Sequence, residues 1–170
     1  MEHLLRVRRI SPDDATSYYT LRSRSLEQLT CAGEPEVLRE LGTGHGKIAN
    51  VLRDYDIEGT QVWGVFNTQT LIGAIGLSRR FPLQKLEIAH VWGVFVMPRY
   101  RGTAVSRLLM EAVVDWCEHD PVVQWIATRF SRSSVHARQY FERFGFEVSD
   151  PSGSASERCD PDLLHMRRRV

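Results

Sequence analysis

The sequence predicts an α/β fold, an α+β three-layer sandwich in which helices flank a mixed, mostly antiparallel sheet. Apolar segments of strand length alternate along the chain with segments of helical periodicity. Two of the strand segments are separated only by the polar residues 67–70, which is a spacing typical of an antiparallel hairpin. We expect one domain over residues 1–170, because a chain of this length forms a single core of ordinary size.

The first elements are read from charge alternation and capping residues. Leu4–Ile10 alternates apolar and basic side chains, as a half-buried strand does. Ser11–Asp14 then supplies an N-cap serine, a proline at the first helical position and a capping acid, so a helix is expected to follow. A second helical region over residues 34–54 is interrupted by the glycine cluster at 42–46.

The middle of the chain is predicted to form the hairpin, a long strand and a helix. The hairpin strands are Gln61–Phe66 and Leu71–Arg80, and the long strand is Lys85–Val96. In the helix that follows, apolar side chains recur at the 3.6-residue period: Val105, Leu108, Leu109, Ala112, Val113 and Trp116. One face of this helix is therefore expected to lie in the core.

The last elements are a strand, a helix and a closing strand. Val122–Phe130 has the composition of a strand. The helix after it begins at the serines 133–134 and is expected to end at Gly145 as a C-terminal cap. A polar surface loop then leads to the closing strand, residues 163–170.

Charge and cysteine usage exclude several classes of protein. The formal net charge is +1 and the sequence pI is about 7.8, so no overall field favours nucleic acid or an anionic membrane. Arg167–Arg169 is interpreted as the exposed end of a strand. Cys31, Cys117 and Cys159 form no C-x-x-C pair, which argues against a disulfide framework and a zinc site. We expect a cytoplasmic protein without a metal, nucleic-acid partner or membrane segment.

The junction between the long strand and its helix has the features of an anion site. Backbone N–H groups at a helix N-terminus are unpaired and lie at the positive end of the helix dipole. Gly102 allows close approach there, and Ala104 and Ser106 are small. A plain strand-to-helix connection is the alternative.

Two motifs resemble those of the GNAT N-acetyltransferase superfamily. The first is the acetyl-CoA motif V-x-P-x-Y-R-G-x-A-V-x-x-x-L, present as Val96, Pro98, Tyr100, Arg101, Gly102, Val105 and Leu109. The second, N-x-x-A-x-x-x-Y-x-x-x-G-F in the family, is present as Ser134, Ala137, Phe141, Gly145 and Phe146. The order of strands and helices is also similar to that fold.

The resemblance implies a splayed central strand pair, an acetyl-CoA co-substrate and the family's tendency to form homodimers. The pantetheine arm would enter the split and pair with the backbone of the long strand, and the turn would hold the pyrophosphate. The implied cofactor-binding residues are Val94, Phe95, Val96, Arg101, Gly102, Thr103, Ala104, Val105, Ser106, Arg107, Ser134 and Phe141.

Three positions depart from the family pattern. Ala104 and Ser106 replace glycine-like residues, and their Cβ atoms would crowd a phosphate if the turn needed positive φ there, but cost little if both are helical. Phe141 replaces the usual tyrosine and has no proton to donate. Tyr140 lies about 100° further round the helix, so it is expected to pack elsewhere. Ser133, Ser134 or water remain as proton donors, or the thiolate leaves without an acid.

Acetyl transfer to an amine also needs a base. His90 stands where many family members have a glutamate, and an imidazole titrates near neutrality. Glu87 is the competing carboxylate, although strand alternation places it on the opposite face from His90. The alternative is that His90 is a strand histidine without a catalytic role.

The predicted function is transfer of an acetyl group from acetyl-CoA to a primary amine of a small molecule or peptide, by direct attack in a ternary complex. A catalytically degenerate acyl-CoA-binding regulatory module is the alternative, and a longer acyl donor is a third possibility. Residues 42–47 do not have P-loop spacing and are expected to form an acceptor loop with His45. Further candidates for acceptor contacts are Trp63, Phe81 and Trp92, for which a core position is the alternative, and Glu34, Glu36 and Glu40, which a solvated helix face also explains.

Overall fold

The computed structural model describes residues 5–28, 42–79, 87–150 and 160–170. The strands are β1 Leu5–Arg9, β2 Thr60–Asn67, β3 Thr70–Ser78, β4 Ile88–Val96, β5 Trp125–Ser131, β6 Glu147–Val148 and β7 Leu163–Arg169. The helices are α1 Ala15–Gln28, α3 Ile48–Glu58, α4 Val105–His119 and α5 Val135–Glu142. Short 3₁₀ turns lie at Pro12–Asp14, His45–Lys47 and Pro98–Tyr100.

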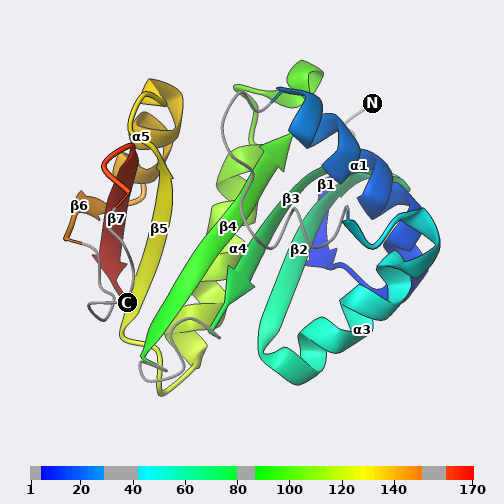
Figure 1. Ribbon diagram of the computed structural model, residues 1–170, viewed down its shortest axis with the longest axis horizontal. Coiled ribbons are helices and arrows are strands. Elements are labelled where there is room, and N and C mark those ends of the chain that lie inside the picture. The colour runs from blue at the N-terminus through cyan, green and yellow to red at the C-terminus, as the bar shows by residue number, and fades with distance from the viewer. Residues whose placement is uncertain (1–4, 29–41, 80–86, 151–159) are drawn as a thin grey trace.

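The strands form one seven-stranded sheet in the order β1-β2-β3-β4-β5-β7-β6 (Figure 1). Every neighbouring pair is antiparallel except β4 and β5, which are parallel. The predicted mixed, mostly antiparallel sheet is therefore confirmed, and the single parallel pair lies at its centre.

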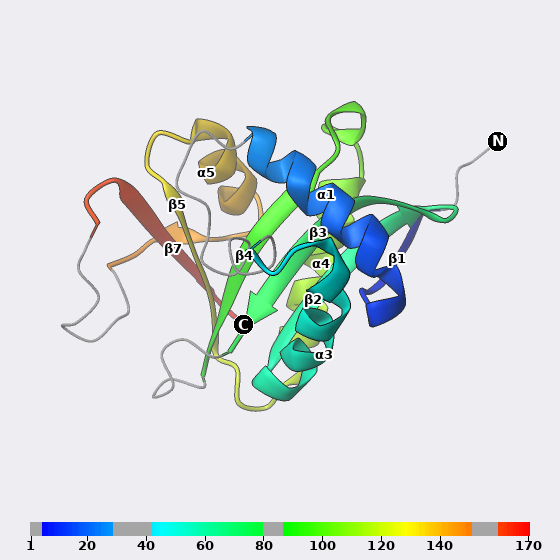
Figure 2. The same cartoon turned by 45° about the vertical axis from the view of Figure 1, so that its right-hand side comes forward.

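Helices cover the two faces of the sheet with separate cores (Figure 2). The amphipathic α4 packs on one face, and its buried positions Val105, Leu109 and Val113 lie in the same cluster as Ile75 and Val91 of the sheet. On the other face, α1 and α3 pack on β2, β3 and β4, and the cluster there is formed by Tyr18, Leu21, Ile48, Val51, Leu52, Tyr55, Val62, Phe66, Leu71, Ala74, Trp92 and Phe95. The three-layer arrangement follows from these two apolar faces.

Several element ends differ from the sequence-based boundaries. The strand expected from residue 122 begins at Trp125, because pairing with β4 starts where the carbonyl of Glu87 accepts from the N–H groups of Gln124 and Trp125 at 2.8 and 3.0 Å. The helix expected to reach Gly145 ends at Glu142. Gly145 still has the left-handed φ of +77° that the prediction required, and its N–H donates to the carbonyl of Glu142. The two-residue strand β6 was not predicted.

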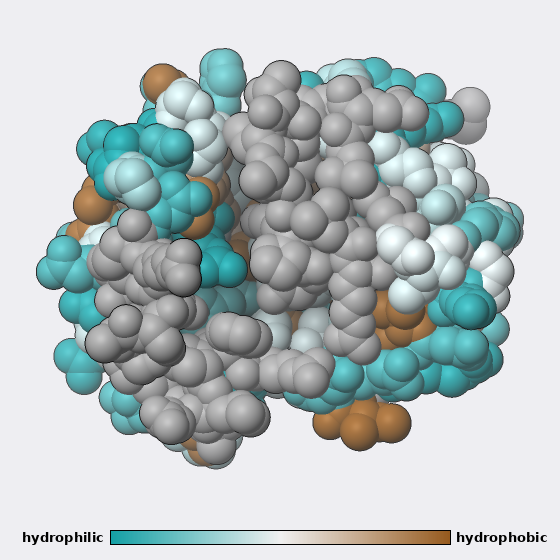
Figure 3. Space-filling view, viewed as in Figure 1, coloured by the Kyte–Doolittle hydropathy of each residue, from teal (hydrophilic) through white to brown (hydrophobic). Residues whose placement is uncertain are grey.

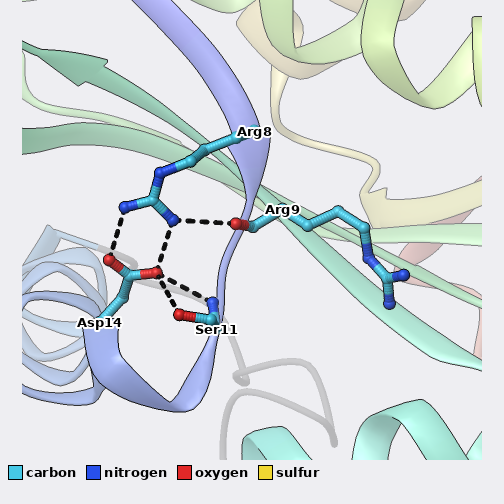
Figure 4. A network of polar contacts seen from close by, with 4 residues as sticks. All are labelled: Arg8, Arg9, Ser11 and Asp14. Atoms are coloured by element: carbon cyan, nitrogen blue, oxygen red, sulfur yellow. Dashed lines mark hydrogen bonds and ion pairs between the residues drawn. The ribbon is translucent and has the colours of Figure 1, made fainter.

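The junction between β1 and α1 is closed by a polar network in which Ser11 and Asp14 have the capping roles expected from the sequence, and Arg8 joins them without having been predicted (Figure 4). The carboxylate of Asp14 accepts from the Ser11 backbone N–H at 2.9 Å and from both terminal nitrogens of Arg8 at 2.7 Å. These hydrogen bonds lower the pKa of Asp14, chiefly through Arg8, and the same pairing raises the pKa of Arg8. The bidentate geometry fixes the entry angle of α1.

Asp14→Asn is expected to destabilise the fold by about 1 kcal/mol at neutral pH, because it removes a charge-assisted pair and a capping acceptor. The pKa of Asp14 is lower in the folded chain, so the ionised carboxylate stabilises the fold above its unfolded pKa and loses this effect as pH falls through the folded value. Urea unfolding of both proteins at pH 7 and pH 3 tests this. An equal difference at both pH values would contradict the role given to the ion pair.

No helix in the described part of the chain is long and apolar enough to cross a membrane.

Candidate functional site

A fork between β4 and β5 forms the centre of the candidate site. The two strands pair in parallel from Ile88 with Trp125 to Val91 with Thr128, and no pair follows (Figure 1). At the last pair, the buried Thr128 hydroxyl donates to the carbonyl of Val91 at 3.1 Å. Beyond this point the edge of β4 over residues 92–96 has no strand partner on the β5 side within the described residues. The predicted splayed pair thus has an anchored apex.

A β-bulge lies directly beyond the apex. On β3, Gly76 pairs with Trp92 and Ala74 pairs with Phe95, so two residues of β3 span three of β4. Gly93 within the bulge has a φ of +59°, a backbone conformation that residues with a side chain rarely adopt. In a regular strand, side chains three positions apart lie on opposite faces, but the bulge keeps Trp92 and Phe95 on the same apolar face. Beyond the bulge, the backbone groups of Val94 and Val96 point to the open edge.

Arg22 of α1 is fully buried against this bulge, and sequence reasoning missed it. Its guanidinium donates to the carbonyl of Gly93, and its Nε donates to the hydroxyl of Tyr18 at 2.9 Å. The guanidinium carbon lies 5.3 Å from the ring centroid of Trp92. A glycine inside an apolar strand is a signal for a bulge, but nothing in the helical pattern of α1 marks one arginine as its partner.

Gly93→Ala is expected to destabilise the fold by about 3 kcal/mol. An added Cβ would lie 2.7, 2.8 and 2.9 Å from the guanidinium atoms of Arg22, in a buried place, and the positive φ adds strain. Gly59→Ala is the matched control, because Gly59 has a φ of +72° with no atom within 4 Å of the added Cβ. Equal losses in urea unfolding would mean that the bulge does not depend on its fit to Arg22.

The strand-to-helix turn has the conformation required of an anion site. Gly102 has a φ of +74°, with no atom within 4 Å of an added Cβ. Ala104 is already helical, with φ −64° and ψ −12°, and Ser106 lies in the first turn of α4. Within the described residues, no hydrogen bond uses the backbone N–H groups of Gly102, Ala104, Ser106 and Arg107. The two residues that replace glycine therefore need no positive φ.

Side chains around the turn hold its shape. The Nε of Arg101 donates to the carbonyl of Val96 at 3.2 Å, and the Thr103 hydroxyl donates to that of Tyr100 at 2.6 Å. Arg107 is exposed and pairs with Glu111 one turn later at 2.7 Å. The structure thus brings the predicted residues 101–107 together at the end of β4.

The second motif packs against the first through α5. The Tyr140 hydroxyl donates to the carbonyl of Ser106 at 2.8 Å, and burial raises the pKa of Tyr140. Phe141 is buried and stacks on Phe130 with a centroid distance of 5.5 Å. Ser134 caps the helix by accepting from the Ala137 N–H at 3.4 Å. Tyr140 therefore ties the two motifs together, a contact that the sequence did not predict, and Phe141 is a core residue.

His90 and Glu87 lie at different places on β4. His90 is half-buried and pairs with Ser78 of β3 and Ala127 of β5, one residue before the apex. Glu87 is exposed and precedes the strand, and its backbone carbonyl accepts from β5. Of the two candidate bases, only His90 is next to the fork.

Other candidate residues are distributed away from the fork. The ring of His45 meets Tyr19 of α1 edge to face, with centroids 5.3 Å apart. Trp63 and Trp92 are 6% and 4% exposed and belong to the two cores, so they do not line an acceptor pocket. Phe81, Glu34, Glu36 and Glu40 lie outside the described residues, as do Cys31 and Cys159.

Neither a cysteine nucleophile nor a bound metal ion is supported by the described residues. Cys117 of α4 is buried in the core, and burial raises its pKa to about 12, so its thiol is a poor nucleophile. Among the described residues, no group of histidine, cysteine and acidic side chains is placed to hold a metal ion.

Comparisons with known proteins agree with this geometry. The family model described as "Acetyltransferase (GNAT) domain" matches residues 46–165. No curated protein sequence matches the chain. An acetyltransferase of the GNAT family from Streptococcus pneumoniae superposes with a TM-score of 0.77 at 14% identity, covering 98% of this chain and 99% of that one.

Two further solved structures are similar. PaiA N-acetyltransferase from Thermoplasma acidophilum, in complex with coenzyme A, has a TM-score of 0.76 at 15% identity, covering 98% of this chain and 99% of that one. YncA from Salmonella typhimurium, with acetyl-CoA, has a TM-score of 0.75 at 12% identity, covering 97% of this chain and 93% of that one. At such low identities the likeness establishes the fold alone.

Proposed function

Because this chain belongs to the GNAT acetyltransferase family, we propose that it transfers an acetyl group from acetyl-CoA to a primary amine of a small molecule or peptide. The observation that supports the proposal most strongly is the succession of three features along β4: the anchored apex, the open edge and the anion-binding turn. Acetyl-CoA would place its thioester at the apex, its amide-bearing arm along the open edge and its pyrophosphate at the turn.

The open edge of β4 is the proposed site for the pantetheine arm. Backbone groups of Val94 and Val96 lie on this edge, which has no strand partner toward β5 in the described chain. Those of Phe95, which was also a candidate, point to β3, because Met97 two residues later donates its N–H to the carbonyl of Ile72. An amide-bearing arm that enters the fork can satisfy the groups on the open edge as an added strand would. Residues 102–107 would hold the pyrophosphate through the free N–H groups at the start of α4 and its dipole.

Acetyl-CoA supplies the acetyl group as a thioester. His90, beside the apex, would take a proton from the attacking amine, directly or through water. A backbone N–H of the β4 edge would stabilise the negative charge that develops on the carbonyl oxygen. The amine would first add to the carbonyl carbon, forming the C–N bond and the oxyanion, whose collapse would then break the C–S bond. The thiolate would take its proton from water or a serine, because Phe141 is buried and has none to donate.

Direct attack in a ternary complex is part of the proposal, since the buried Cys117 offers no covalent route. Initial rates of thiol release, measured while acetyl-CoA and an amine are both varied, test this. Intersecting double-reciprocal plots and an acetylated amine detected by mass are expected. Parallel plots would indicate a covalent intermediate, and absence of any acetylated amine would contradict acetyl transfer.

A further inference from the structure

Among the described residues, helices pack on only part of the width of the sheet face on which His90 lies. The core beneath α1 and α3 draws its sheet residues from β2, β3 and β4, and within the described residues none comes from β5 or β7. Figure 1, viewed from this side, shows α1 and α3 in front of the right half of the sheet, with β5 and β7 to the left of these helices. We call the part over β5 and β7, on which no described helix packs, the uncovered face. His90 stands at its border.

Strand register defines which side chains share this uncovered face. His90 pairs with Ala127, which pairs with Arg167, so the three form one row across β4, β5 and β7. Arg129 pairs with His165 in the adjacent row. The alternate positions of β5 and β7 face α4 and α5 and are buried, among them Ile126, Thr128, Leu164 and Met166.

The uncovered face is basic, and its arginines have few acidic neighbours. Arg129, Arg167 and Arg169 are all exposed. The side chain of Arg129 forms no hydrogen bond or ion pair with any described residue. Arg167 stacks on Trp125, with its guanidinium carbon 4.4 Å from the ring centroid, which restricts the position of the charge. Glu147 of β6 pairs in register with Arg167, yet no ion pair joins them.

The positions of these charges relative to the fork suggest their role. Thr128 is the last residue of β5 that pairs with β4, and Arg129 follows it directly. On β4, His90 directly precedes Val91, the last paired residue. Two strand spacings of about 4.8 Å separate His90 from Arg167, with only the small Ala127 between them. An acceptor could therefore present its amine beside His90 and an anionic group to the arginines.

We propose that the acceptor is a small primary amine that also bears a carboxylate or phosphate, and that Arg129 and Arg167 bind this anionic group. The inference rests on the proposed acetyl transfer, whose acceptor it specifies. In the space-filling view from the same side, hydrophilic residues, with a few hydrophobic ones among them, are visible at the left edge of the molecule, where Figure 1 draws β6 and β7 (Figure 3). The pyrophosphate turn begins α4, which packs on the opposite face of the sheet, so the two anion sites are distinct.

Matched acceptors test the inference. Thiol release from acetyl-CoA is measured with γ-aminobutyrate, aminopropyl phosphate and butylamine, which have similar spacers but differ in the anionic group. We expect kcat/KM to be at least about tenfold higher for one or both of the anionic amines than for butylamine. The two anionic acceptors distinguish a carboxylate site from a phosphate site.

Variants then link the preference to the two arginines. Arg129→Gln and Arg167→Gln are each expected to raise KM for the preferred anionic amine by about tenfold, with little effect on kcat, on butylamine or on acetyl-CoA binding. Arg53→Gln is the matched control, because Arg53 is exposed on α3 and bonds only to Asn50.

Each alternative result has a definite meaning. Equal efficiency for all three amines, or higher efficiency for butylamine, overturns the inference and leaves the proposed acetyl transfer intact. Weaker acetyl-CoA binding in either variant also overturns it, since these arginines would then serve the co-substrate. If acetyl-CoA binds but no amine is acetylated, both the inference and the proposed acetyl transfer to small amines fail.

Discussion

Gly102→Glu is expected to weaken acetyl-CoA binding by at least about 100-fold, because it places a carboxylate where a pyrophosphate is to bind. Gly102 begins the turn whose free N–H groups precede α4, and its φ of +74° also disfavours a side chain. Calorimetric titration of the variant with acetyl-CoA measures the effect. The exposed turn leaves room for the new side chain, so the fold itself is expected to persist.

Gly59→Glu separates the local effect from strain and charge. Gly59 has a φ of +72°, has no atom within 4 Å of an added Cβ, and lies at the end of α3, away from the turn. This control carries the same charge change in a similar backbone conformation and is expected to bind acetyl-CoA as the unsubstituted protein does. Unchanged affinity in Gly102→Glu, or equal losses in both variants, would mean that the pyrophosphate binds elsewhere.

His90→Ala is expected to lower kcat by about two to three orders of magnitude while acetyl-CoA affinity changes little. The side chain lies beside the apex of the fork, whereas the turn that is to hold the pyrophosphate lies beyond the other end of β4. Initial rates of thiol release at saturating acetyl-CoA measure kcat, and calorimetric titration measures the affinity.

His119→Ala is a suitable control, because His119 is exposed at the end of α4 and bonds to the backbone of Asp115. Its backbone hydrogen bond raises the pKa of His119, but loss of this surface group is expected to leave kcat unchanged. A kcat for His90→Ala equal to that of the unsubstituted protein would remove His90 from the mechanism.

Features that depend on neighbouring residues were predictable from the sequence. Ser11 and Asp14 are three positions apart and close the junction before α1 as expected. Gly102 and Gly145 have positive φ where the motif and the helix end require it. The helical state of Ala104, which decides whether its Cβ obstructs the turn, follows from its place before α4. In each case the controlling interactions are local.

Features that depend on packing between distant segments were not predictable. Arg22 and Gly93 are 71 positions apart, and only the fold brings the guanidinium to the carbonyl of the bulge. The short strand β6 forms because β7 offers its edge to Glu147 and Val148, two residues without a strong strand pattern of their own. Trp63 and Trp92 had two interpretations from the sequence, a pocket lining and a core position, and only the fold shows that they fill the two cores.

The arginines of the uncovered face show the same contrast between local features and features that depend on distant segments. Arg167–Arg169 was correctly interpreted as the end of a strand. Its relation to His90 emerges only from the register across β5, which places Ala127 between them. Charge composition alone gave no indication of this local basic surface, since the chain as a whole is nearly neutral.

The measurement that tests the central claim most directly is calorimetric titration of the protein with acetyl-CoA and, in parallel, with free coenzyme A. The fork, the open edge of β4 and the turn before α4 predict micromolar binding of both ligands, with one site per chain. Absence of binding by either ligand would contradict the proposed site.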